Sequence, residues 1–170
     1  HDVLHRDVKP ANLVLDNDNN IWMTDFGLAI SMENDLAATQ GNRAGTFRYM
    51  SPEKITGGED SISGDIYSLG ITLIELLSGK PAFLQNSRLE LTDAILNSNF
   101  SITDSSGKPI RGDLRAILVK ATDADLAKRY TTPTDLMNDL EKLIQRMPVS
   151  ANPPTPVGIA WRWVKRNRAL

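Results

Sequence analysis

Short apolar blocks alternate with polar blocks over the first quarter of the chain. Residues 13–15 and 21–23 are apolar runs, and the spacer between them reads DNDNN. Because Asn and Asp favour turns, this pattern predicts a β-hairpin. Residues 28–50 contain Gly, Asn, Ser and Thr with little periodicity, so we expect one long loop there. A loop of that length inside a compact domain usually has a function.

The pattern then changes to helical spacing. Ser63 can cap the start of a helix, and Gly79 followed by Pro81 can end it. The apolar side chains between them cover nearly the whole circumference, which predicts a buried central helix rather than a surface helix. These side chains are Ile66, Leu69, Ile71, Leu73, Ile74, Leu76 and Leu77.

Three further helices are predicted. Residues 88–97 and 112–121 carry apolar residues at helical spacing. The last helix has Thr132 as its cap, Pro133 in its first turn and Asp135 near its positive end. Its apolar face comprises Leu136, Leu140, Leu143 and Ile144. The fold class is therefore mainly α with a small β-hairpin, built from about four helices and one long loop.

The composition changes after Met147. Residues 148–160 form a Pro-rich stretch, which predicts an extended linker. Residues 161–170, WRWVKRNRAL, contain four basic residues, two Trp and no acid. This tail is either a disordered end or a juxtamembrane stem whose residues 161–168 contact a membrane surface.

Composition and charge exclude several classes of protein. The chain of 170 residues is 41% hydrophobic and is long enough for one domain with its own core. Its formal net charge of -2 argues against nucleic-acid binding by bulk electrostatics. It has no Cys, so disulfides and thiolate metal sites are excluded. No apolar run reaches the length of a membrane span.

Several motifs follow one another in a specific order. They are HRDVKPAN at 5–12, DFG at 25–27, GTFRYMSPE at 45–53, DIYSLG at 65–70 and LAKRY at 126–130. Together they resemble serine/threonine protein kinases, and most of all bacterial receptor-type kinases. The resemblance covers residues 1–147. It implies the large, C-terminal lobe of the α+β protein-kinase-like fold, and ATP with Mg²⁺ as the nucleotide and metal.

The resemblance also implies roles for the polar residues. Asp7 would accept or orient the proton of the substrate hydroxyl, and Lys9 would reach the γ-phosphate. Asn12 and Asp25 would supply oxygen ligands to Mg²⁺. Lys9 and Thr46 fit serine and threonine substrates in proteins rather than tyrosine.

A second set of roles concerns the nucleotide and the scaffold. Val14 would form the floor beneath adenine, with Leu13 and Leu15 facing the core. His5 would stack below Phe26, which precedes Gly27 in the DFG motif. Asp65 would bond to the backbone beside His5, and the remaining scaffold pair would be Glu53 and Arg129.

Regulation is implied by Arg6, a cation that can clamp a phosphate on the long loop. Among the loop hydroxyls we favour Thr39 as the phosphorylated residue. The kinase would lie in the cytoplasm, either free or as the cytoplasmic domain of a single-pass membrane protein.

The family's small lobe carries a Gly-rich loop, a strand lysine and a helix glutamate. No segment of the 170 residues matches them, so we expect the chain to begin at the catalytic loop, to lack the N-terminal lobe and to be inactive alone. Two alternatives remain. One is a pseudokinase-like docking module, against which the filled catalytic positions argue. The other is a small-molecule phosphotransferase of related fold, which GTFRYMSPE disfavours.

Overall fold

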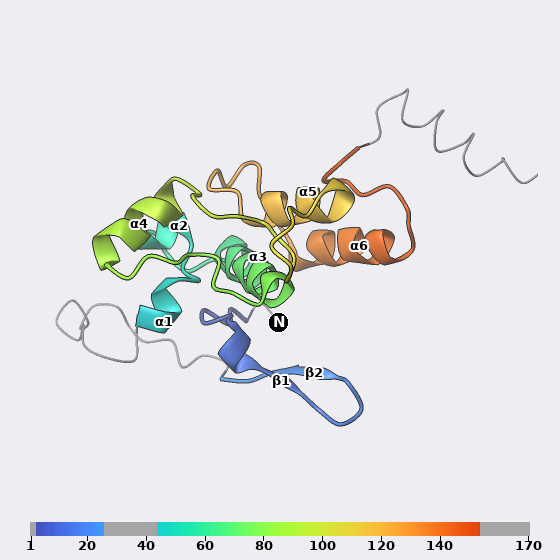
Figure 1. Cartoon of the computed structure of the whole chain (residues 1–170), viewed down its shortest axis with the longest axis horizontal. Helices are drawn as coiled ribbons and strands as arrows, with labels where there is room; N and C mark the ends of the chain where they lie inside the picture. Colours follow the sequence, from blue (N-terminus) through green and yellow to red (C-terminus); the bar gives the residue numbers. More distant parts are fainter. Residues whose placement is uncertain (1–2, 26–43, 154–170) are drawn as a thin grey trace, which may run out of the picture.

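The computed structural model describes residues 3–25 and 44–153 (Figure 1). Within these ranges the chain forms one short 3-10 helix, a two-stranded sheet and six α-helices. In order they are η1 (Pro10–Asn12), β1 (Leu13–Leu15), β2 (Ile21–Met23), α1 (Ala44–Phe47), α2 (Pro52–Ile55), α3 (Ile62–Ser78), α4 (Arg88–Leu96), α5 (Gly112–Ala121) and α6 (Pro133–Ile144). The prediction of a mainly helical fold with one small hairpin is confirmed.

The hairpin pairs β1 with β2 in antiparallel register, with Leu13 opposite Met23 and Leu15 opposite Ile21. Asp16 organises the turn, because its carboxylate accepts bonds from Trp22 Nε1 at 2.7 Å and from the backbone of Asn20 at 2.8 Å. The Trp22 bond, more than the others, lowers the pKa of Asp16 to about 2. The turn composition therefore predicted the hairpin correctly.

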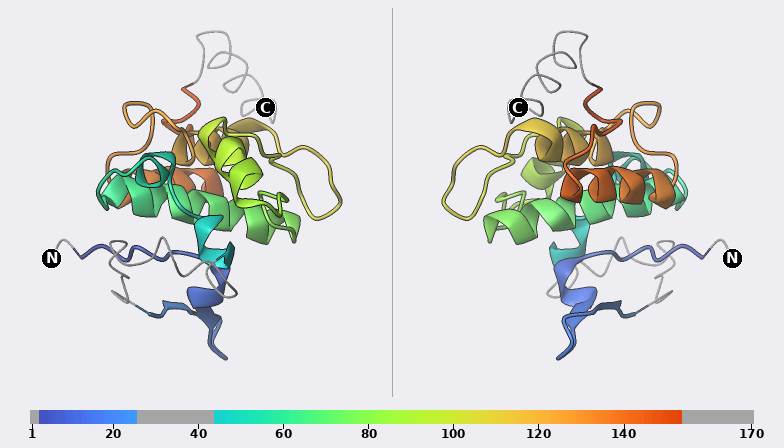
Figure 2. Two further views of the ribbon diagram at one scale, coloured as in Figure 1. Left: turned by 90° about the vertical axis from the view of Figure 1, so that its left-hand side faces the viewer. Right: turned by 90° about the vertical axis from the view of Figure 1, so that its right-hand side faces the viewer.

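The hairpin projects away from the helical body, as both views of Figure 2 show. Leu15 is 62% exposed, so the expectation that it faces the core is wrong. Leu13 is only partly buried, and Val14 is exposed. The reason is that no helix of the described residues packs over the hairpin, whereas the sequence pattern alone suggested a buried strand.

Helix α3 runs through the centre of the body (Figure 1). Its N-cap is Ser61, whose side chain accepts a bond from the backbone of Gly64, so the predicted cap at Ser63 is wrong. Ser61 has the extended backbone of a cap, whereas Ser63 already lies inside the helix. At the other end Gly79 adopts φ 68°, the left-handed conformation that favours glycine.

Two hydrophobic clusters pack on α3. The first joins α3 to α4 and α5, and its buried members are Tyr67, Ile71, Ile74, Phe83, Leu91, Ala94, Ile95, Ile102 and Leu118. The second joins α3 to α5 and α6 through Ile66, Ile117, Ala121, Tyr130, Leu136 and Val149. The prediction of a buried central helix is confirmed, except that Leu76 is exposed.

The remaining helices differ from the prediction in detail. Helices α4 and α5 are confirmed, and α6 begins after Thr132, whose hydroxyl accepts a bond from the backbone of Asp135. Ile144 is exposed, so it does not belong to the buried face of α6. The four-residue helices α1 and α2 were not predicted, and α1 makes the prediction of a loop wrong at residues 44–47. Residues 28–43 of that loop lie outside the described residues.

The folded body extends beyond residue 147. Val149 is buried in the second cluster, and Ala151 packs against that cluster. The extended linker predicted from residue 148 is therefore wrong at 149–152, because these residues pack on α5 and α6. The basic tail lies outside the described residues. No helix within residues 3–25 and 44–153 combines the length and apolar character that a membrane span requires.

Candidate active site

Side-chain hydrogen bonds connect Asp7, Lys9, Asn12 and Thr46 in one chain. Lys9 Nζ donates to Asp7 Oδ2 at 2.7 Å and to Thr46 Oγ1 at 2.9 Å. Asn12 Nδ2 donates to the backbone oxygen of Asp7 at 2.8 Å and to its Oδ2 at 3.0 Å. Thr46 reaches this cluster from α1, 37 positions further along the chain. Lys9 and Asn12 thus both donate to the same carboxylate oxygen of Asp7.

The hairpin links this cluster to Asp25. Asn12 ends η1, is buried, and its backbone oxygen accepts a bond from the backbone of Thr24 at 2.9 Å. Asp25 follows directly, is exposed and has φ 61°. A non-glycine residue in this left-handed region is uncommon and costs free energy, and such residues gather at functional sites. The two ends of one hairpin therefore carry the two predicted Mg²⁺ ligands.

The oxygens present fit a magnesium ion. The amide nitrogen of Asn12 is used in its bonds to Asp7, so its amide oxygen is the atom that can ligate a metal. Among residues 3–25 and 44–153 no three His, Asp or Glu side chains converge on one point. Mg²⁺ usually takes only one or two carboxylates from the protein and fills its octahedron with phosphate oxygens and water. A pair such as Asn12 and Asp25 is the donor set that this mode requires.

Asp7 also has an oxygen that nothing in the described part of the chain satisfies. Its Oδ1 is buried and accepts no hydrogen bond from residues 3–25 or 44–153, whereas its Oδ2 accepts bonds from Lys9 and Asn12. An unpaired buried acceptor costs about 1–3 kcal/mol, so it is seldom retained without a use. This oxygen is suited to accept a bond from the hydroxyl of a substrate.

Asp65, at the start of α3, holds the loop before Asp7 in place. Its two carboxylate oxygens accept bonds from the backbone of His5 at 2.7 Å and of Arg6 at 2.8 Å. Arg6 has φ 68°, and these two bonds stabilise that strained backbone. The buried ring of His5 meets the backbone oxygen of Thr24 at 2.9 Å and accepts a bond from the backbone of Asp7 at 3.3 Å. His5 is therefore a scaffold residue that joins the loop carrying Asp7 to the hairpin.

The side chain of Arg6 has a partner that was not predicted. Its Nε lies 3.6 Å from Asp60 Oδ2, and Lys54 Nζ lies 3.0 Å from Asp60 Oδ1. Asp60 precedes α3 in the stretch GGED, which looks like an ordinary loop. The only indication in the sequence of a pairing between Asp60 and Arg6 was the negative charge of Asp60. Phe26, Gly27 and Thr39 lie outside the described residues.

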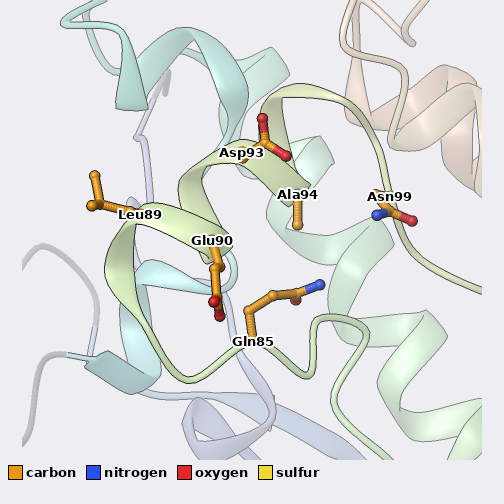
Figure 3. Close-up of a pocket in the computed structure, with 6 residues that line it drawn as sticks. All are labelled: Gln85, Leu89, Glu90, Asp93, Ala94 and Asn99. Atoms are coloured by element: carbon orange, nitrogen blue, oxygen red, sulfur yellow. The ribbon is translucent and has the colours of Figure 1, made fainter.

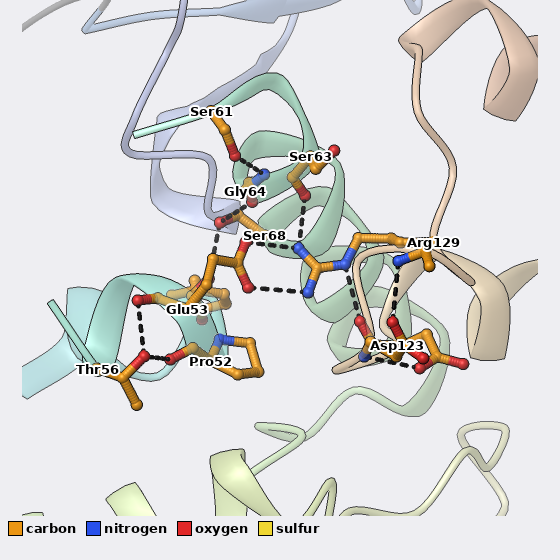
Figure 4. Close-up of polar contacts among 12 residues, drawn as sticks. Pro52, Glu53, Thr56, Ser61, Ser63, Gly64, Ser68, Asp123 and Arg129 are labelled. Carbon is orange, nitrogen blue, oxygen red and sulfur yellow. Dashed lines mark hydrogen bonds and ion pairs between the residues drawn. The ribbon is translucent and has the colours of Figure 1, made fainter. Parts of the chain in front are cut away.

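Glu53 and Arg129 form the expected pair (Figure 4). Arg129 donates to the two oxygens of Glu53 at 2.7 and 2.9 Å, to the backbone oxygen of Ser63 at 2.9 Å and to that of Asp123 at 2.8 Å. Burial opposes ionisation of Glu53, but the bonds from Arg129 hold its pKa below the usual value. This pair fastens α2 to the start of α3 and to the segment before α6.

A hollow lies beside α4 (Figure 3). It has a volume of 460 Å³ and contains none of the predicted site residues. Its lining consists of Gln85, Leu89, Glu90, Asp93, Ala94 and Asn99.

Several known proteins have sequences similar to this chain. The protein kinase domain family matches residues 1–147. The chain is 32% identical over 139 residues to the serine/threonine-protein kinase PrkC of Bacillus subtilis, covering 82% of this chain and 22% of that protein. It is 31% identical over 150 residues to the serine/threonine-protein kinase PknB of Mycobacterium leprae, covering 88% of this chain and 24% of that protein. The chain thus spans less than a quarter of the length of these relatives.

Proposed function

The chain belongs to the protein kinase family, and from this premise we propose that it forms the catalytic large lobe of a serine/threonine protein kinase. The reaction would transfer the γ-phosphate of ATP to Ser and Thr hydroxyls of proteins. The names of the relatives, which are serine/threonine-protein kinases, support this class of enzyme. We expect the 170-residue chain alone to be inactive, because nothing in its sequence matches the Gly-rich loop and the strand lysine of the family.

One observation supports the proposal most directly, namely the bridge that Lys9 makes between Asp7 and Thr46. The lysine and Asn12 fix Asp7 through Oδ2, which leaves Oδ1 for the proton of the incoming hydroxyl. Thr46 places its own hydroxyl beside the same ammonium. The side chains of serine and threonine have the same length as the side chain of Thr46. Substrate hydroxyls on side chains of this length are therefore consistent with the role of phosphate acceptor.

Nucleotide and metal would be held on the hairpin side of the cluster. Asn12 and Asp25 would ligate Mg²⁺, which offsets charge on the phosphate oxygens. Lys9 can move from Thr46 toward a phosphate as a mobile cation on a flexible stem. Val14 is exposed and apolar, so it can contact the adenine ring.

Regulation and location are part of the same proposal. A phosphate on Thr39 would bind Arg6 and fix the loop that carries it. The kinase would act in the cytoplasm, and the basic tail at 161–168 would contact the anionic surface of a membrane.

A docking module without catalysis is the second candidate. It would need a folded large lobe but would not need Asp7, Lys9, Asn12 and Asp25 together. The bonds among the first three argue for catalysis, since each one positions a group that binding alone does not require.

The replacement Asp7→Asn in the full-length protein tests the proposal. Asparagine keeps the size of the side chain but removes the carboxylate base, so phosphate transfer from radiolabelled ATP to a protein substrate should fall about 10²–10⁴-fold. Asp18→Asn is the matched control, because Asp18 is an exposed carboxylate in the hairpin turn. If Asp7→Asn and Asp18→Asn both transfer phosphate at the wild-type rate, the proposed role of Asp7 is wrong.

A further inference from the structure

A buried carboxylate holds the segment that follows the last helix. Asp139 lies on the inner face of α6 and is 1% exposed. Its oxygens accept bonds from the backbone of Ser150 at 2.7 Å, from the backbone of Ala151 at 2.9 Å and from the hydroxyl of Tyr130 at 2.7 Å. We call residues 149–152 the strap. Its backbone is thus fastened to α6 by a charge that water barely reaches.

Two other contacts support the strap from either side. Val149 is buried in the second hydrophobic cluster. At the far end Asn152 Nδ2 donates to Asp113 Oδ1, at the start of α5, at 2.7 Å. The strap therefore crosses from α6 to α5, and contacts with the folded body hold both of its ends.

Ser150 is the exposed point of this arrangement. Its Oγ donates to Asp139 Oδ2 at 2.7 Å, yet the residue as a whole is exposed. It lines a hollow of 360 Å³ between α5 and α6 together with Lys120, whose Nζ lies 3.4 Å from the same Oγ. A hydroxyl at the surface is therefore bonded directly to a buried carboxylate.

We propose that Ser150 is a phosphorylation site and that its phosphate releases the strap from α6. The source of the phosphate rests on the proposed function of this family, transfer from ATP to Ser and Thr hydroxyls, but the effect of the phosphate does not. In the transfer the Oγ–H bond is lost, Oγ bonds to the γ-phosphorus, the bond from that phosphorus to ADP breaks, and the proton leaves to a base.

The phosphorylated strap cannot return to its closed position. The esterified Oγ has no proton to donate, and the phosphate brings about -1.5 to -2 charges against Asp139. The hollow beside Ser150 is lined by four basic residues, Lys120, Lys128, Arg129 and Lys142. Three of them already have partners, because Lys120 lies 4.3 Å from the centroid of the Tyr130 ring, Lys128 pairs with Asp125 and Arg129 pairs with Glu53. Asp139 is buried and lies 2.7 Å from the oxygen that would carry the phosphate, so its repulsion outweighs the attraction of these cations.

The order of events follows from the same contacts. A closed strap keeps Oγ bonded to Asp139, so a kinase can accept Ser150 only during a local opening. Phosphorylation then removes the closed state and traps the open one, which is a population shift rather than a forced rearrangement.

Amide hydrogen exchange on the 170-residue protein tests the release without any kinase activity. With phosphoserine incorporated at position 150, the amides of Ser150 and Ala151 should exchange about tenfold faster or more, the change that corresponds to about 1.4 kcal/mol. Phosphoserine at position 106 is the matched control, because Ser106 Oγ also donates to an aspartate, Asp104, at 2.7 Å, but Ser106 is exposed and Asp104 is only partly buried. It should leave the strap unchanged.

Two further exchange measurements distinguish release of the strap from loss of the hydroxyl alone and from general unfolding. Ser150→Ala removes the hydroxyl but keeps both backbone bonds to Asp139. The amides of residues 150 and 151 should therefore exchange far less rapidly in this variant than in the phosphoserine protein. Exchange in α3 should stay slow in every variant. Unchanged or slower exchange at 150 and 151 with phosphoserine would overturn the release, and so would a matching loss of protection in α3, because the strap would then not be a separate unit.

Access to Ser150 is tested with an active serine/threonine kinase of this family, ATP and Mg²⁺. The acceptor is the 170-residue chain carrying Asp7→Asn. Adding Asp139→Asn should raise incorporation at Ser150 severalfold, since it weakens the closed strap. If the kinase phosphorylates a general protein substrate but never Ser150, even with Asp139→Asn, the site assignment is wrong. If the natural protein containing this chain proves to have no kinase activity, the proposed function fails while both tests of Ser150 keep their meaning.

Discussion

Replacing Arg129 by methionine should destabilise the fold more than any surface charge change. The side chain of Arg129 is 0% exposed and donates four hydrogen bonds, two of them to Glu53. Methionine fills similar space but donates nothing. It leaves Glu53, the backbone oxygen of Ser63 and that of Asp123 without their donor.

The expected loss is about 3–5 kcal/mol of unfolding free energy, the range for breaking one side of a buried ion pair. Glu53→Gln should cost a similar amount, because it leaves the buried guanidinium without its counter-charge. The double variant should lose less than the sum of the two single variants, since neither charge then remains unpaired. The exposed pair of Lys128 and Asp125, 3.3 Å apart with side chains 69% and 50% exposed, is the control. Lys128→Met should cost less than about 1 kcal/mol.

Urea unfolding followed by circular dichroism measures all four variants on one scale. The reasoning depends on burial, so the contrast between Arg129→Met and Lys128→Met is the decisive quantity. If both cost less than about 1 kcal/mol, or if the two single variants of the buried pair are additive, the pair does not stabilise the fold in the way described.

Three other predictions address packing, pH and regulation. Gly70→Ala should cost about 1–3 kcal/mol in urea unfolding, because a Cβ there would lie 2.6 Å from Thr122 Cγ2; an unchanged midpoint would refute the close packing of α3 on α5. Burial opposes ionisation of Asp139, but bonds from Ser150, Tyr130 and Ala151 hold its pKa below the ordinary 3.8. Its stabilisation is therefore complete at neutral pH and is lost as pH falls below about 4, so Asp139→Asn should flatten the acid limb of a stability–pH curve. Thr39→Ala should lower the kinase activity of the full-length protein, and mass spectrometry of active enzyme should find phosphate on Thr39; full activity of the variant would place the switch elsewhere.

Local chemistry in the sequence was sufficient for the hairpin and for most helix ends. The turn between β1 and β2 depends on Asp16 and its neighbours within six positions. Gly79 and Thr132 end and begin their helices through contacts within four positions. Such contacts are set by neighbouring residues, so the order of residue types predicts them. The candidate catalytic residues Asp7, Lys9 and Asn12 were proposed in the same way, because they lie close together in the chain.

Distant contacts were predicted only where the family resemblance implied them, as for Glu53 with Arg129 and for Asp65 with the backbone beside His5. Thr46 joins Lys9 from α1, and Asp60 pairs with Arg6 and Lys54 from the segment before α3. Nothing in the spacing of these residues along the chain encodes their distance in space. That distance depends on how α1, α2 and α3 pack, which is decided by the whole set of buried contacts.

The last helix gives the clearest case of this division. Asp139 lies between Leu136 and Leu143 on the apolar side of α6. The helical periodicity alone could therefore have indicated that this carboxylate is buried. Its partners were not readable, because Ser150 belongs to a stretch whose prolines predict an extended linker. The order of residue types was enough to predict that α6 forms and where it begins. The return of the strap to α6 follows from packing, because a buried carboxylate is tolerable only where several donors converge on it. Sequence order does not encode that convergence.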